Sequence, residues 1–157
     1  MGQPVNGFYQ ITEAMFNYFN ALDEVASVTL GNLSDVALKD ITQYALVHIV
    51  PFDTTIGEKV NIYSFGIYAI DKVDINKFDF REMPDFRGTD NLHDAWHEMD
   101  KVLTGFVNQA RRGTLWNDNF VLNGDPTMTP FKDRFEHVLA GWELTVNIEV
   151  YHGGIIC

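Results

Sequence analysis

Near its end, the chain carries a segment that alternates strictly between apolar and polar residues, AGWELTVNIEV at positions 140–150. Successive side chains of a β-strand point to opposite sides, so this period of two predicts a strand with one side in a core. The apolar side consists of Trp142, Leu144, Val146, Ile148 and Val150. The polar side consists of Glu143, Thr145, Asn147 and Glu149, and we predict that it faces solvent or a channel.

A second strand is predicted at residues 59–70, KVNIYSFGIYAI, and both of its sides are apolar or aromatic. One side has Val60, Ile62, Tyr68 and Ile70, and the other has Tyr63, Phe65, Ile67 and Ala69. Because a two-layer domain normally leaves one face of its sheet in water, we predict that another subunit or layer covers the second side. The predicted subunit interface consists of Tyr63, Phe65, Ile67, Phe78, Phe80 and Phe86. Gly66, in the middle of the strand, predicts a bulge or a close backbone approach.

Two amphipathic helices are predicted from apolar residues at helical spacing, one at residues 8–22 and a longer one at residues 91–112. A short strand is predicted at residues 26–30. The run QYALVHIV at residues 43–50 predicts a strand that is buried on both faces and ends at Pro51. Residues 71–90 form a charged connection, which we predict to be mobile or to contact a partner.

Residues 114–129 contain Asn123-Gly124 and Asp125-Pro126, which are typical of turns, so we predict a loop with one short strand at residues 120–122. Gly141 predicts a bend before the last strand. Together these elements predict a single α+β domain over residues 1–157, in which two helices pack on a mostly antiparallel sheet of four to five strands. A chain of 157 residues is long enough to bury one substantial core.

Eleven basic residues stand against 22 acidic ones, and the formal charge of −11 excludes proteins that grip nucleic acid or anionic lipid electrostatically. The single cysteine, Cys157, excludes an internal disulfide and a cysteine-based zinc cluster within one chain. No apolar run is long enough to span a membrane and the first residues do not resemble a secretory signal, so we expect a soluble protein made in the cytoplasm.

The pattern that most resembles an enzyme is HDAWHEMD, in which His93 and His97 lie four residues apart and Asp100 follows. Imidazoles at this spacing can share a zinc ion on one side of a helix. The zinc-protease motif H-E-x-x-H is not formed, because Lys101 stands where its second histidine would be. His48 lies inside an apolar strand, where a hydrogen bond to backbone or to a neighbouring strand is the common arrangement. We expect no catalytic, cofactor-binding or metal-binding residue.

The order of the predicted elements and three phrases resemble one family. The phrases are ALVHIV, NIYSFGIYAIDKVD and PFKDRFEHVLAGWELTVNIEV. They resemble the tail-terminator or tail-completion group of small neck proteins in tailed bacteriophages, including those of crAss-like phages, over residues 8–157. Residues 71–90 and 113–130 depart from the family's pattern, which leaves open which neighbouring ring each loop meets.

This resemblance implies a structural virion protein that forms a ring, commonly a hexamer, between the head-side connector and the tail tube. Its partners would be its own copies and the adjacent connector and tail proteins. The negative charge would let DNA pass without specific binding, because like charges repel. Three alternatives remain: a related connector or stopper protein of the neck, a small metal-dependent hydrolase using His93, His97 and Asp100, and a monomeric adaptor that binds its partner through the aromatic sheet face.

Overall fold

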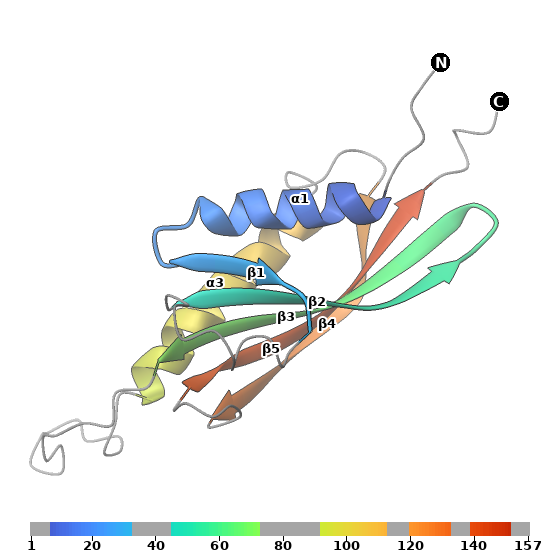
Figure 1. The fold of residues 1–157 in the computed structure, drawn as a ribbon. Helices are drawn as coiled ribbons and strands as arrows, with labels where there is room; N and C mark the ends of the chain where they lie inside the picture. The colour runs from blue at the N-terminus through green and yellow to red at the C-terminus, as the bar shows by residue number, and fades with distance from the viewer. Residues whose placement is uncertain (1–6, 33–44, 73–91, 113–119, 133–138, 152–157) are drawn as a thin grey trace, which may run out of the picture.

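The computed structural model describes residues 7–32, 45–72, 92–112, 120–132 and 139–151. Within these ranges, two helices pack on a five-stranded sheet (Figure 1). The helices are α1 (Gly7–Asn20) and α3 (Leu92–Arg111). The strands are β1 (Ser27–Leu30), β2 (Leu46–Ile56), β3 (Val60–Lys72), β4 (Phe120–Lys132) and β5 (Leu139–Tyr151).

The strands lie in the order β1-β2-β3-β5-β4. Only the β1–β2 pair is parallel, and the three other neighbouring pairs are antiparallel. The predicted α+β class, with a mostly antiparallel sheet and two helices, is therefore confirmed. The predicted helices at residues 8–22 and 91–112 match α1 and α3 to within two residues at each end.

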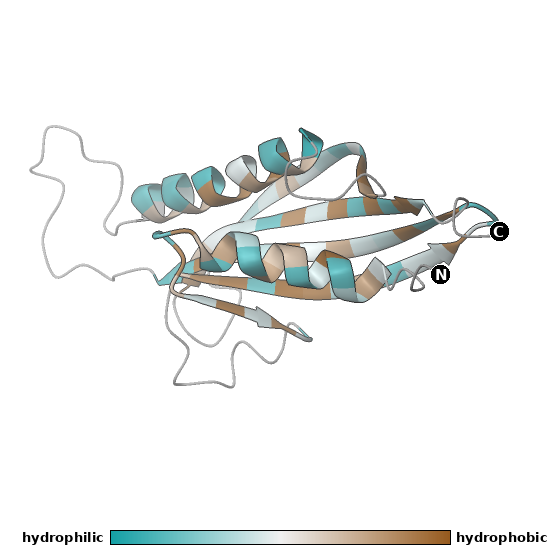
Figure 2. Ribbon diagram, turned by 90° about the horizontal axis from the view of Figure 1, so that it is seen from above, coloured by the Kyte–Doolittle hydropathy of each residue, from teal (hydrophilic) through white to brown (hydrophobic). Residues whose placement is uncertain are grey.

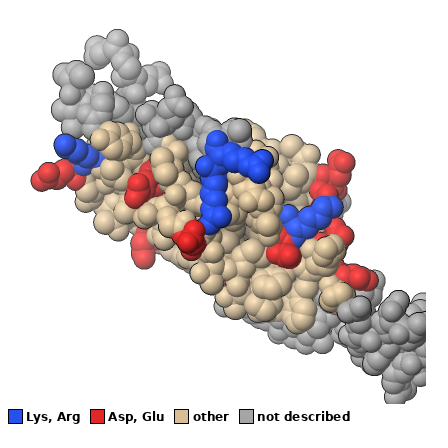
Figure 3. Space-filling model, turned by 180° about the vertical axis from the view of Figure 1, so that it is seen from behind, with Lys and Arg blue, Asp and Glu red and all other residues tan. Residues whose placement is uncertain are grey.

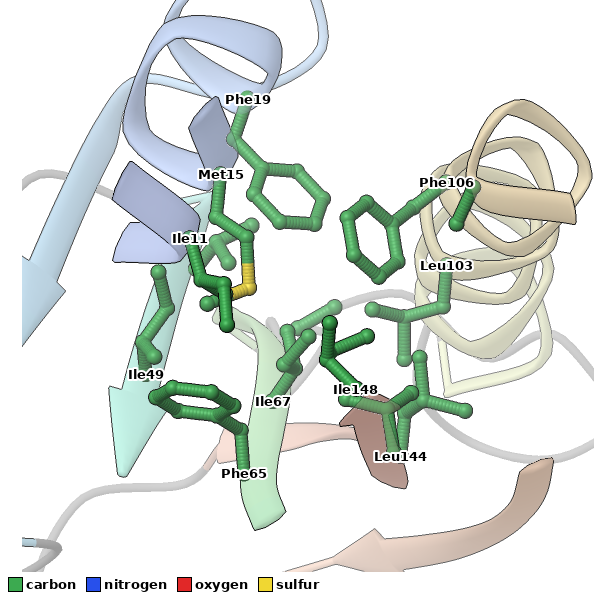
Figure 4. Close-up of a cluster of buried hydrophobic side chains, with 14 of the residues drawn as sticks. Ile11, Met15, Phe19, Ile49, Phe65, Ile67, Leu103, Phe106, Leu144 and Ile148 are labelled. Carbon is green, nitrogen blue, oxygen red and sulfur yellow. The ribbon is translucent and has the colours of Figure 1, made fainter. Parts of the chain in front are cut away.

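Both helices lie on the same face of the sheet, which we call the inner face (Figure 2). The buried residues of α1 recur at helical spacing; Ile11 and Met15 point toward the strands, and Phe19 points toward Phe106 of α3 (Figure 4). Leu103 and Phe106 of α3 point toward the same core, where Leu144 and Ile148 of β5 meet them. The rings of Phe19 and Phe106 stack with centroids 5.0 Å apart, so one core joins the two helices and the sheet.

Two indole hydrogen bonds attach the first half of α3 to the strands beneath it. Trp142 of β5 donates from Nε1 to the carbonyl oxygen of Trp96 at 2.8 Å. Trp96 in turn donates from Nε1 to the carbonyl oxygen of Phe131 in β4 at 3.1 Å. Because both indoles are half-buried, these bonds satisfy N–H groups that would otherwise lose their water partners.

The strand predicted from the alternating segment is confirmed as β5. Its apolar side faces the helices, and Leu144, Val146, Ile148 and Val150 are buried there. Its polar side lies on the opposite face of the sheet, which we call the outer face. The period of two was sufficient here because, over the alternating residues 142–150, the apolar side chains lie on one side of the strand only.

The prediction that the strand at residues 43–50 ends at Pro51 is wrong, because β2 continues to Ile56. Pro51 instead ends the pairing of β1. The N–H of Gly31 donates to the carbonyl oxygen of Ile49 at 3.1 Å. In a parallel ladder the carbonyl of Gly31 would next accept from the N–H of residue 51, and proline has none. On its other side, β2 stays paired with β3 through Pro51 opposite Phe65, and the pairing resumes at Thr54 after a shift in register.

The strand predicted at residues 120–122 is confirmed as the start of β4, but the loop predicted to follow it at residues 123–129 is wrong, because β4 runs from Phe120 to Lys132. Residues 114–119 lie outside the described residues. The turn-like residues form an irregularity within the strand: its register against β5 shifts between Asn123 and Thr127, and Gly124 has a φ of 71°. Bulges keep a strand paired on both sides of the extra residues, and a local turn pattern does not exclude them.

Gly141 was predicted at a bend, but it lies inside β5 opposite Ile70. A Cβ atom at position 141 would lie 1.8 Å from the carbonyl oxygen of Ala69. The glycine therefore serves a close approach of the β3 and β5 backbones, which is the other common reason for a glycine in a strand.

Candidate interaction surfaces

The predicted subunit interface on β3 is contradicted by the position of its residues. Phe65 and Ile67 are 1% and 0% exposed and belong to the core beneath the helices, where Phe65 stacks on Phe8 of α1. Tyr63 is half-buried on the same face and also contacts Phe8. The prediction is therefore wrong for Phe65 and Ile67, because α1 already covers their side of β3, and it stays a prediction for the half-buried Tyr63. Phe78, Phe80 and Phe86 lie outside the described residues.

The other side of β3 is covered within the same chain at one end of the outer face. Tyr68 and Ile70 are buried in a second small cluster with Leu46, Phe131 and Leu139. The Tyr68 ring lies 6.3 Å from that of Phe131, and its hydroxyl donates to the Glu143 carboxylate at 3.0 Å. The doubly apolar half of β3 thus has cover on both sides, and it does not by itself call for a second subunit.

The middle of the outer face is polar. The predicted channel-facing or solvent residues Glu143, Thr145, Asn147 and Glu149 all lie there; Thr145 is exposed and the other three are half-buried. The neighbouring strands continue the polar surface with Ser64, Asn123, Thr127 and Thr129. The hydroxyl of Ser64 donates to Oδ1 of Asn147 at 2.5 Å. This face presents carboxylates and hydrogen-bonding groups, and whether it lines a channel remains a prediction.

The most exposed part of the sheet is the end of the β2–β3 hairpin, residues 51–59, which we call the arm. All nine residues are exposed, and Figure 1 shows the turn reaching past the end of β5. The register of β2 against β3 shifts between Pro51 and Thr54, so the arm begins with a bulge. A Cβ atom at Gly66 would lie 2.4 Å from Cζ of Phe52, so Gly66 makes room for this ring, in line with the predicted close approach.

Exposed large apolar side chains gather at the arm end of the molecule. Phe52 and Ile56 of the arm are 45% and 81% exposed. Four more exposed apolar side chains lie at the same end: Phe8 and Tyr9 of α1, Val121 of β4 and Tyr151 of β5. The pairing of Val60 with Tyr151 places the end of β5 beside the arm. Gly7 lies against Tyr63 and Val150, which places the start of α1 there as well. Among the described residues, only Leu30 of this class lies elsewhere. Scattered apolar residues are ordinary on a surface, but a concentration at one end marks a contact region.

The edge of β2 beyond its pairing with β1 and the edge of β4 both carry features that block the addition of another strand. On β2 these are Pro51 and the bulge that follows it. On β4 they are Pro126, Pro130 and the irregularity at Gly124. Proline has no N–H to offer and bulges break the regular spacing of hydrogen-bonding groups, so these edges are poor templates for edge pairing. Contacts of the arm end with another molecule must therefore be made mainly by side chains.

The residues of the hydrolase alternative lie on the solvent side of α3. His93 and His97 are exposed, and Oδ1 of Asp100 accepts a hydrogen bond from the Thr104 hydroxyl at 3.0 Å. In the described ranges no three His, Cys, Asp or Glu side chains come together as metal ligands would. The zinc alternative therefore has no geometric observation in its favour.

His48 has the arrangement that its apolar surroundings predicted. It is buried, and its Nε2 donates to the carbonyl oxygen of Asn32 at 3.0 Å, which leaves Nδ1 of the neutral ring to accept from the Thr29 hydroxyl at 2.6 Å. Thr29 belongs to β1, so the imidazole fixes β1 and the residues after it to β2. This is a structural role.

The charged side chains of the described residues are scattered over the surface. On the side seen in Figure 3, acidic and basic groups alternate without a continuous basic area. Over the part of the chain that the structure covers, neither helix has the length and hydropathy that crossing a membrane requires. No family model matches this sequence, and a search of curated proteins found no match.

Proposed function

We propose that this chain is a structural subunit of a tailed-phage virion, which forms a hexameric ring at the junction of head and tail. The ring would end the tail, join it to the connector and let DNA pass without specific binding. Its place would be the neck of the virion, and it would carry out no catalysis and hold no cofactor. The basis is the resemblance of three phrases, whose described residues fall mainly on β2, β3, β5 and the end of β4.

The observation that carries the assembly part of this proposal is the gathering of exposed apolar residues at the arm end. A monomer leaves Ile56 and Phe52 in water, whereas contact with another copy would remove this apolar area from water at roughly 25 cal/mol per Å². Since β3 is covered within one chain, the arm end replaces the β3 side as the candidate interface.

The polar outer face supports the passage of DNA. Carboxylates and hydroxyls along β5 would give a lumen without the Lys and Arg side chains that hold phosphates, and the whole chain has a formal charge of −11. An acidic lumen repels DNA and therefore does not retain it.

The proposal is tested by measuring the particle mass of the purified protein with native mass spectrometry, together with its metal content by elemental analysis. We expect a ring-sized particle without stoichiometric metal, and we expect rings in negative-stain images. The variant His97→Ala should assemble like the wild type. A monomer at every concentration would contradict the ring, and a monomer with one zinc ion per chain would favour the hydrolase.

A further inference from the structure

A hollow of about 240 Å³ opens where α3 ends beside the first residues of β4. Its lining includes Ala110, Arg111, Arg112, Phe120, Val121 and Leu122. A cavity needs only about 10–15 Å³ to hold one water molecule, so this hollow has room for a side chain. Phe120 and Leu122 in its lining are buried and Val121 is 55% exposed, so part of the lining is apolar.

The two arginines of the hollow differ in their partners. Arg111 donates from Nη2 to Oδ1 of Asp125 at 2.8 Å, which fixes the end of α3 to the irregular part of β4. Arg112 is exposed, and none of the described carboxylates forms an ion pair with it. The hollow therefore combines apolar side chains with one guanidinium that forms no ion pair with a described carboxylate.

The tip of the arm has the complementary chemistry. Ile56 is the most exposed large apolar side chain of the described residues, at 81%, and Glu58 follows two residues later, also exposed. A branched aliphatic side chain beside a carboxylate matches an apolar hollow beside a guanidinium.

We propose that the arm tip of one copy inserts Ile56 into this hollow of the next copy, with Glu58 near Arg112. The arm belongs to the β2 side of the sheet and the hollow lies at β4, the opposite edge. The contact therefore joins two different surfaces, and such head-to-tail contacts close into a ring when the rotation permits. This inference rests on the proposed ring and names the surfaces that close it.

Cysteine cross-linking tests the contact directly. In a Cys157→Ser background, the chain carries no other cysteine. The pair Ile56→Cys with Val121→Cys should give a ladder of disulfide-linked oligomers on a non-reducing gel, up to the full ring. The matched control is Leu30→Cys with Val121→Cys, because Leu30 is exposed away from the arm end, and it should stay uncross-linked.

Charge exchange tests the polar half of the contact. Glu58→Lys and Arg112→Glu should each raise the dissociation constant of the assembly by roughly tenfold or more, and the double variant should recover most of the loss. Ile56→Asp should raise it by roughly ten- to a hundredfold, as expected for a central anchor.

The outcomes separate this inference from the proposed function. Rings that form without the 56–121 cross-link, and that tolerate Ile56→Asp, would overturn the arm-to-hollow contact and leave the ring intact. A wild-type protein that stays monomeric would overturn the proposed function and this contact together.

Discussion

The two halves of the β2–β3 hairpin both carry large apolar side chains but have opposite environments. In the half near β1, Leu46 to Ile49 of β2 and Phe65 to Ile70 of β3 are buried on both faces of the sheet. In the arm, nine consecutive residues are exposed although they include Phe52 and Ile56. The difference comes from what lies beside the strands: β1 and the helices cover one half, and Pro51 and the bulge stop β1 from following β2 into the other. One hairpin therefore serves as core at one end and as candidate contact surface at the other.

The largest effect on stability is expected from a substitution in the buried half of the hairpin. Phe65→Asp puts a carboxylate into the core under α1, which should lower the free energy of unfolding by at least about 4 kcal/mol, a large part of a typical total. Urea denaturation followed by circular dichroism measures this. A Phe65→Asp protein that unfolds like the wild type would show that α1 does not cover this face. Phe65→Leu, as the control, should cost much less.

Substitutions at two glycines test whether the atoms that an added Cβ would meet are able to move. Gly141→Ala would press a Cβ atom against the carbonyl of Ala69, and neither backbone can move without separating β3 from β5, so we expect a loss of about 3 kcal/mol. Gly66→Ala meets only the ring of Phe52, which is 45% exposed and can turn away, so we expect about 1 kcal/mol. Equal losses in thermal or urea unfolding would contradict this distinction.

A smaller effect is expected at alkaline pH from the contact between the two helices. Burial, and secondarily the carboxylate of Glu24, raise the pKa of Tyr18 above 10.0, and its ring packs against Phe19 and Phe106. The native state then holds the phenol proton more tightly than the unfolded state. The contribution of the protonated Tyr18 to the free energy of unfolding is fully present below pH 10.0 and is lost as the pH rises through the raised pKa.

The comparison of wild type with Tyr18→Phe isolates this contribution. Between about pH 8 and about pH 11, on either side of the ordinary tyrosine pKa of about 10, the wild type should lose more unfolding free energy than the variant. Parallel pH profiles of the two proteins would show that Tyr18 ionises equally in both states.

The smallest effect on folding is expected in the arm. Ile56→Ser removes a side chain that is 81% exposed, so the unfolding free energy of the dissociated chain should change by less than about 0.5 kcal/mol. Urea denaturation at low protein concentration measures this. A loss close to that of Phe65→Asp would mean that the arm belongs to the core, and the contrast between the two halves would disappear.

The sequence by itself determined the elements whose pattern is local. The alternation at residues 140–150 and the helical spacing at residues 8–22 and 91–112 each identify a face that must be buried, and the resulting strand and helices form where expected. It also determined the class of fold, because two amphipathic helices and several apolar strands have few ways to cover one another. The apolar residues on either side of His48 in the sequence also predicted that its ring would be buried and hydrogen-bonded to backbone or to a neighbouring strand.

The tertiary structure alone decided which side of β3 lies beneath the helices. Because both sides are apolar, the alternation of side chains does not indicate which of them the helices cover. The predicted interface therefore fell on residues that α1 covers. The tertiary structure alone also decided the length of β4 and the role of Pro51. A bulge or a proline ends a strand only where a neighbouring strand needs hydrogen bonds from that edge, and the sequence does not show which edges have a neighbour. Local patterns report which side chains avoid water, whereas the identity of the neighbour depends on contacts between residues far apart in the chain.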